Sequence, residues 1–294
     1  MTRVAFIGLG NMGSGMAANQ VKAGREVLAF DLSAEALTRA KEQGMSPASS
    51  AAEAVKDADI VITMLPAGQH VSGVYGEAIL PNARKDALLI DCSTIDVDTA
   101  RTVARDAAMA GFRAADAPVS GGTAAATGGT LTFMVGCREQ DFTDFEDALK
   151  PMAKAVIHAG ATGAGQAAKI CNNMLLGISM IGTCEAFALA ERLGLDAQRF
   201  FDIASKASGQ CWSLTSYCPW PGPVPAAPSN RNYEGGFAAA MMLKDLKLSQ
   251  DAAESLGAST PLGGGAEALY NEFVARGFGG KDFSAILEML RGKL

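Results

Sequence analysis

Two polar side chains interrupt an apolar helical pattern, and their types and spacing suit proton transfer. Lys169 and Asn173 are four residues apart, which places both on one face of a helix. Their neighbours are mostly small or apolar, which indicates burial. Desolvation lowers the pKa of a buried lysine toward neutrality, where its amine can both accept and donate a proton. We therefore predict that Lys169 is a general acid/base; a surface lysine that reaches solvent is the alternative.

The composition leaves few other groups for such chemistry. The 294 residues include only two histidines, which excludes a metal site built mainly from imidazole and disfavours a histidine acid/base. No metal site is predicted. With a net charge of −6, the chain lacks the basic surface that is typical of nucleic-acid-binding proteins. Its 49% hydrophobic residues disfavour a disordered chain.

A glycine-rich turn predicts a bound dinucleotide. The motif follows a short apolar run and opens a helical pattern, and it reads Gly8, Leu9, Gly10, Asn11, Met12 and Gly13. Its glycines permit a tight turn and close approach of a pyrophosphate to the helix N-terminus. Asp31 ends the next apolar run, where a carboxylate binds the adenosine ribose and repels a 2′-phosphate. NAD is therefore preferred to NADP; a turn without ligand, or Asp31 as a helix cap, is the alternative.

Three more segments follow predicted strands, at the sheet edge where ligands bind. One predicted strand is followed by Met64, Leu65 and Pro66, and another by Thr94. We predict that these residues contact the cofactor; ordinary strand-to-helix loops are the alternative. Ser120, Gly121 and Gly122 follow a proline turn that begins at Asp116. A hydroxyl beside exposed backbone N–H groups suits a substrate carboxylate. The two glycines could also serve only a turn.

The elements that must position these residues fall into two regions. Apolar runs alternate with helical patterns over residues 1–162, which predicts a Rossmann-like, doubly wound parallel sheet. The runs are Val4–Ile7, Val27–Phe30, Ile60–Leu65, Leu88–Ile90, Phe133–Val135 and Val156–His158. Residues 163–294 predict an all-α domain, joined to the first by a long helix over about Gln166–Leu193. The proline-rich stretch Cys218–Gly236 predicts an ordered loop.

The long apolar stretch and the cysteines bear on localisation. Ile170–Ala190 has few charges, and we expect a helix buried on all sides and not a membrane span. The six cysteines form no C-x-x-C pair and are expected to be reduced and buried. A strand pattern at the N-terminus in place of a targeting segment indicates a cytoplasmic protein.

Four motifs in this order and spacing resemble those of the β-hydroxyacid dehydrogenase family. They are Phe6–Gly13, Asp116–Gly122, Gly165–Asn173 and Lys244–Leu246, and the resemblance covers nearly the whole chain. It implies that Lys169 is the catalytic acid/base and that Ser120, Gly121, Gly122 and Asn173 hold the substrate. It also implies that Lys244 lies near the cofactor and that the chain forms a homodimer or homotetramer.

The branch of the family is suggested by two features. Asp31 fits NAD, and the prolines after Cys211-Trp212 resemble the branch that oxidises 3-hydroxyisobutyrate. Trp212 and Phe237 would then contact the substrate; each could instead be a core aromatic. The expected reaction is oxidation of 3-hydroxyisobutyrate to methylmalonate semialdehyde in valine breakdown. The alternatives are the same chemistry on L-serine or another short 3-hydroxy acid, and a dinucleotide-binding module without turnover.

Overall fold

Short buried strands alternate with helices in the first of two units into which the chain divides. The computed structural model describes all residues from 1 to 294, and the units are Met1–Lys169 and Ile170–Leu294. The strands of the first unit are β1 (Arg3–Ile7), β2 (Glu26–Phe30), β3 (Ser46–Pro47), β4 (Ile60–Thr63), β5 (Leu88–Asp91), β6 (Arg113–Asp116), β7 (Val119–Ser120), β8 (Leu131–Gly136) and β9 (Ala153–Gly160). Its helices are α1 (Gly13–Lys22), α2 (Ala34–Glu42), α3 (Ala51–Val55), α4 (Gly68–Val74), α5 (Leu80–Asn82), α6 (Val97–Met109), α7 (Gly122–Gly128) and α8 (Phe142–Leu149).

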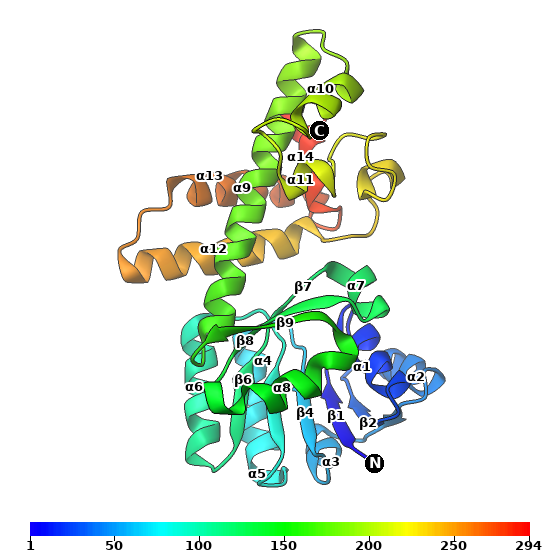
Figure 1. Cartoon of the computed structure of the whole chain (residues 1–294), viewed down its shortest axis with the longest axis vertical. Coiled ribbons are helices and arrows are strands. Elements are labelled where there is room, and N and C mark those ends of the chain that lie inside the picture. The colour runs from blue at the N-terminus through cyan, green and yellow to red at the C-terminus, as the bar shows by residue number, and fades with distance from the viewer. The chain divides into compact units, whose positions relative to one another are not determined.

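The strands form one sheet in the order β3-β2-β1-β4-β5-β6-β8-β7, with β9 beside β8 (Figure 1). Neighbours from β3 to β6 run parallel, which confirms the Rossmann-like class. The sheet is nevertheless not parallel throughout, because β8 is antiparallel to both β6 and β7. A proline turn at Pro118 and the short strand β7 bring the chain back along the edge, so the regular crossover stops after β6.

Both faces of the sheet are buried, because successive side chains of a strand point to opposite faces. On β1, Val4 and Phe6 belong to one hydrophobic cluster and Ala5 and Ile7 to the other. Each of these side chains is at most 3% exposed. Helices cover both clusters, as a doubly wound fold requires.

The second unit is all-α, as the sequence predicts. Helix α9 (Ala164–Arg192) begins in the first unit and continues into the second. The other helices are α10 (Ala197–Ala204), α11 (Trp212–Thr215), α12 (Ala239–Leu256), α13 (Pro261–Phe273) and α14 (Ile286–Leu290). Helix α12 begins after Phe237, whose N–H donates to the Asp282 carboxylate.

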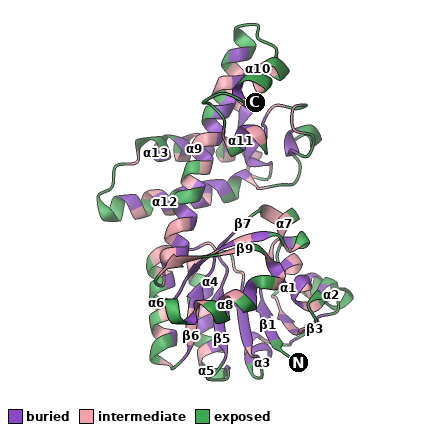
Figure 2. Ribbon diagram, viewed as in Figure 1, coloured by how far each residue is buried: buried purple, intermediate pink, exposed green.

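Helix α9 is not buried on all sides, so that prediction is wrong. Met180, Cys184 and Phe187 lie in the core of the second unit, whereas Leu175 and Leu189 are 63% and 60% exposed. Figure 2 shows buried and exposed positions alternating along this helix. Apolar residues occur on every face of the helix, so its hydrophobicity alone could not show which face is covered. The helix is long and apolar enough to cross a membrane by length and composition, but a core helix of a soluble protein passes the same test.

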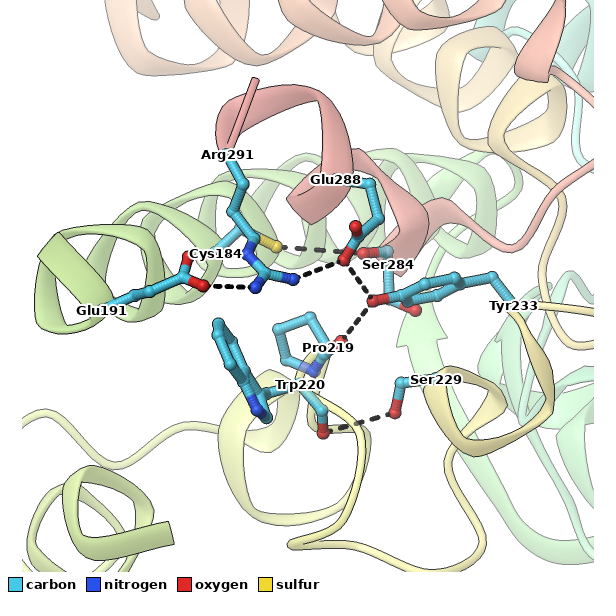
Figure 3. A network of polar contacts seen from close by, with 9 residues as sticks. All are labelled: Cys184, Glu191, Pro219, Trp220, Ser229, Tyr233, Ser284, Glu288 and Arg291. Carbon is cyan, nitrogen blue, oxygen red and sulfur yellow. Dashed lines mark hydrogen bonds and ion pairs between the residues drawn. The ribbon is translucent and has the colours of Figure 1, made fainter. Parts of the chain in front are cut away.

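The proline-rich segment is an ordered loop. The Asn230 side chain bridges it, because its Oδ1 accepts from Gly222 N at 2.8 Å and its Nδ2 donates to Val224 O at 2.8 Å. The Tyr233 hydroxyl donates to Pro219 O at 2.9 Å, as Figure 3 shows. These bonds take the place of the helical ladder that the prolines exclude. All six cysteines are free thiols; four are buried, whereas Cys171 is exposed.

Arg291 fastens the C-terminal end of the chain to α9 and to this loop. Its guanidinium donates to Glu191 at 2.8 Å and to Glu288 at 2.9 Å. It also lies 4.1 Å from the centre of the Trp220 ring, which gives a cation–π contact (Figure 3). The side chain is only 9% exposed, so these contacts are largely shielded from water.

Replacement of Arg291 should therefore destabilise the second unit. For Arg291→Ala we expect a loss of about 2 kcal/mol, because two ion pairs and the ring contact disappear and Glu288 keeps a half-buried charge. Thermal melting followed by circular dichroism measures this loss. Arg276→Ala is the matched control, since Arg276 pairs with Glu272 at an exposed position. Equal melting temperatures for the two variants would contradict the assigned role of Arg291.

Candidate active site

The glycine turn after β1 packs against the end of β4. Gly8 has φ +96°, and a Cβ at this position would stand 2.3 Å from the Met64 carbonyl oxygen. Only glycine fits that conformation and that contact. A Cβ on Gly10, by contrast, would meet nothing within 4 Å, so the backbone there is open to a ligand. Helix α1 begins at Gly13, directly after the turn.

Asp31 holds the same turn from the end of β2. Its Oδ2 accepts the Leu9 N–H at 2.6 Å and its Oδ1 accepts the Ser33 N–H at 2.8 Å. The cap of α2 is Ser33, whose hydroxyl accepts the Ala36 N–H, so Asp31 is not the helix cap. The carboxylate thus stands beside the glycine turn, at the position predicted to bind a ribose.

The loops after β4 and β5 are tied to each other. The Leu65 N–H donates to Ser93 Oγ at 2.8 Å, and that hydroxyl donates to Asp91 Oδ1 at 2.6 Å. Met64 and Pro66 flank Leu65, and the half-buried Thr94 follows Ser93. The structure therefore brings the predicted cofactor residues of the first unit to one edge of the sheet.

These residues fit a dinucleotide. The open backbone at Gly10 leaves room for a pyrophosphate beside the start of α1, and Asp31 supplies a carboxylate for ribose hydroxyls. Asn11 and Met12 complete the turn, with Asn11 exposed.

Lys169 lies beside the segment predicted to bind the substrate carboxylate. Only 8% of Lys169 is exposed, and its Nζ donates to Val119 O at 2.7 Å. Val119 directly precedes Ser120 on β7. Gly121 and Gly122 follow with φ +136° and +70°, conformations that suit glycine and turn the chain into α7. The structure thus brings the predicted acid/base and the predicted carboxylate site together.

Two further buried polar residues fix the start of α9. The Asp116 carboxylate accepts the Gly163 N–H at 2.7 Å and the Gln166 N–H at 2.8 Å, one on each oxygen. The Gln166 side chain donates to Ser93 O at 2.7 Å and accepts the Ile95 N–H at 3.1 Å. Asp116 is 3% exposed and Gln166 is fully buried. Burial raises the pKa of the Asp116 carboxyl to about 6.

In the second unit, Asn173 is paired with an acidic residue of α12. Its Nδ2 donates to Asp245 Oδ2 at 2.6 Å, and its Oδ1 accepts from Asn172 at 3.0 Å. Both Asn173 and Asp245 are almost fully buried. Lys244, predicted to lie near the cofactor, precedes Asp245 and is half-buried.

The aromatic residues predicted for the substrate are organised by Asp282. Its Oδ2 accepts the Tyr217 hydroxyl at 2.7 Å and the Phe237 N–H at 2.8 Å. Trp212 stacks on Tyr217, with 4.9 Å between the ring centres, and is 51% exposed. Trp212 and Phe237 therefore belong to one cluster, and Trp212 is not a buried core residue.

Sequence reasoning left several of these partners without a role. Asp116 and Gln166 lie inside the motifs that resemble the β-hydroxyacid dehydrogenase family. Each is a polar residue among apolar ones, and this pattern could have indicated a role. Asp245 interrupts the apolar run of α12 in the same way. Asp282 has a local partner in Ser284, but its bonds to Tyr217 and Phe237 give no such signal because those residues are far away in the sequence.

Comparison with known proteins identifies the family of the chain. Residues 3–160 match the model of the NAD binding domain of 6-phosphogluconate dehydrogenase, and residues 163–290 match the NAD-binding domain of NADP-dependent 3-hydroxyisobutyrate dehydrogenase. A probable 3-hydroxyisobutyrate dehydrogenase of Mycobacterium tuberculosis is 48% identical over 100% of this chain and 99% of its own. The chain belongs to the 3-hydroxyisobutyrate dehydrogenase family.

Other members of the family agree in fold and in chemistry. A solved structure of Mycobacterium tuberculosis 3-hydroxyisobutyrate dehydrogenase with L-serine has a TM-score of 0.95 at 48% identity and covers 99% of both chains. An NAD-dependent L-serine dehydrogenase of Pseudomonas aeruginosa is 45% identical over 98% of each chain. The predicted fold, the dehydrogenase class and the nicotinamide cofactor are confirmed.

The position of Asp31 predicts how cofactor choice should respond to mutation. Asp31→Ala removes the carboxylate that would repel a 2′-phosphate, so the ratio of kcat/KM for NAD to that for NADP should fall at least about tenfold. KM for NAD should rise, because the Leu9 N–H loses its acceptor. Steady-state kinetics with both cofactors measures the ratio. Asp57→Ala, an exposed acidic residue of the same unit, controls for net charge, and an unchanged ratio in Asp31→Ala would refute the role.

Proposed function

We propose that this protein oxidises 3-hydroxyisobutyrate to methylmalonate semialdehyde with NAD, as a step of valine breakdown. The observation that carries the proposal is the buried Lys169, held 2.7 Å from Val119 O beside the Ser120–Gly122 turn. Near-full-length identity of 48% to probable 3-hydroxyisobutyrate dehydrogenases supports the substrate. Residues 1–162 serve as the NAD-binding domain and residues 163–294 as the substrate and dimerisation domain.

Lys169 performs the proton transfer in this proposal. Its neutral amine takes the proton of the C3 hydroxyl as the C3–H bond is oxidised to the aldehyde. In the reverse direction its ammonium returns that proton to the carbonyl oxygen. NAD, when bound, supplies the hydride acceptor.

The remaining residues bind and orient. The Ser120 hydroxyl and the N–H groups of Gly121 and Gly122 hold the substrate carboxylate. Asn173, one turn after Lys169 and fixed by Asp245, orients the substrate or the lysine. Trp212 and Phe237 contact the substrate. The cofactor contacts are Gly8, Leu9, Gly10, Asn11, Met12, Asp31, Met64, Leu65, Pro66, Thr94 and Lys244.

L-serine is the second candidate substrate. It shares the carboxylate and the primary alcohol of 3-hydroxyisobutyrate and carries an ammonium where the latter has a methyl group. The L-serine dehydrogenase relative and the related structure with L-serine favour this alternative. An aromatic cluster favours the methyl group, because transfer of an ammonium to an apolar site is costly.

The chain is proposed to act as a cytoplasmic homodimer or homotetramer. The exposed face of α9 supports self-association, since Leu175 and Leu189 on the helix and Leu193 directly after it are each at least 60% exposed. Large exposed apolar side chains at helical spacing are typical of surfaces that a second chain covers.

A substrate panel tests the proposed reaction. The kcat/KM values for 3-hydroxyisobutyrate, L-serine, 3-hydroxypropionate and D-glycerate are compared by NADH absorbance. We expect 3-hydroxyisobutyrate to exceed L-serine by at least about tenfold, because burying an ammonium in place of a methyl group costs more than about 1.4 kcal/mol. A higher value for L-serine would transfer the assignment to that substrate.

The role of the lysine is tested separately. Lys169→Ala should lower kcat by at least about 100-fold, because the transition state loses its general base. The Kd of NAD, measured by fluorescence titration, should stay within about twofold, since the glycine turn is untouched. Lys154→Ala, at an exposed position of β9, is the control. Near-normal turnover of Lys169→Ala would exclude the proposed mechanism.

A further inference from the structure

The start of α9 is held by contacts that come from three segments of the sheet edge. Asp116 at the end of β6 accepts the N–H of Gly163, directly before α9, and the N–H of Gln166 in its first turn. Gln166 bonds to Ser93 and Ile95 in the loop after β5. Lys169 bonds to Val119 on β7. Three separate anchors fix both the axial position and the rotation of the turn that carries the lysine.

Close packing leaves this turn little freedom to move. A Cβ on Gly165 would stand 2.3 Å from Met134 O and 2.8 Å from Asp116 Oδ2. A Cβ on Gly136 would stand 2.3 Å from Asp116 Oδ1. The helix backbone therefore lies directly on β6 and β8, and the carboxylate is enclosed between them.

We propose that Asp116 and Gln166 are positioning residues for Lys169: they hold the first turn of α9 on the sheet edge and so set the place of the lysine amine. The inference rests on the proposed function, because it assigns the positioning to the reaction of that lysine. Small displacements of a reacting group matter, since a shift of about 1 Å can cost about 100-fold in rate.

The charge of Asp116 gives this arrangement a pH dependence. The ionised carboxylate accepts one N–H group on each oxygen. Burial raises the pKa of this carboxyl to about 6. The groups that face it are the Asp91 carboxylate on β5, whose charge also raises this pKa, and the Cys137 thiol after β8. Tyr75 lines the small cavity that Asp91 and Asp116 share, and burial keeps the pKa of its phenol well above the usual value. As pH falls through about 6, Asp116 gains a proton, and the protonated oxygen becomes a weaker acceptor for its backbone N–H group.

The reduction of the aldehyde is the direction in which to measure this effect. Lys169 acts there as an ammonium, so loss of its proton lowers the rate only at higher pH. An acid limb near pH 6 in the wild-type rate then reports Asp116. For Asp116→Asn we expect kcat at pH 7.5 to fall at least about tenfold and the limb near pH 6 to disappear. KM for NADH should stay within about twofold.

Two variants and one background complete the test. Gln166→Met should lower kcat and keep the acid limb, and it tests the proposal even if Asp116→Asn does not fold. In the Lys169→Ala background neither substitution should lower the rate further, because a positioning residue acts through the lysine. Asp196→Asn, which removes a carboxylate charge at the start of α10 and leaves an oxygen that can accept the Arg199 N–H, is the control and should leave the rate and the limb unchanged.

Hydrogen exchange tests the positioning role of Asp116 independently of the proposed substrate. Amides in the peptide 161–170 of the full-length protein should exchange at least about tenfold faster in Asp116→Asn than in the wild type at pH 7.5. This readout needs no turnover, so it holds even if another 3-hydroxy acid is the substrate. Unchanged exchange, a kcat within twofold of wild type, or a further loss in the Lys169→Ala background would overturn the proposal.

Discussion

The Asp116 carboxylate at the start of α9 is the interaction on which the arrangement of the first unit depends. A buried charge is unfavourable unless it is hydrogen-bonded, and here each oxygen accepts a backbone N–H of the helix start. Those N–H groups have no partner within the helix, so one carboxylate satisfies two requirements at once. It also joins β6 to the helix that carries Lys169.

The same sheet edge gathers the other polar segments by similar means. Ser93 accepts the Leu65 N–H and itself donates to Asp91, while its carbonyl accepts from Gln166. The loop near Thr94 is therefore tied both to the β4 loop and to α9. Few of these bonds join charged groups; most are backbone contacts that set distances and directions. In the proposed reaction, this edge positions the cofactor and the base.

Much of this arrangement could be predicted from the sequence, because it depends on short sequence motifs. The glycine turn and the helix face shared by Lys169 and Asn173 can be predicted from short motifs, and Asp31 from its spacing after the glycine motif. The antiparallel return of β8 was not predicted, since it depends on which edge the chain meets after Pro118. Asp282 was missed because its partners Tyr217 and Phe237 are 65 and 45 residues away. The exposed face of α9 was missed because apolar residues occur on all faces of that helix.

The proposed reaction requires that the anchored Lys169 exchange the proton of a 3-hydroxy acid. The most direct measurement is a crystal structure of the protein with NAD and 3-hydroxyisobutyrate. We predict that the Lys169 Nζ lies within about 3 Å of the C3 hydroxyl oxygen, with the substrate carboxylate on Ser120, Gly121 and Gly122. A substrate hydroxyl that lies on another titratable side chain, with Lys169 still on Val119 O and out of its reach, would contradict the account.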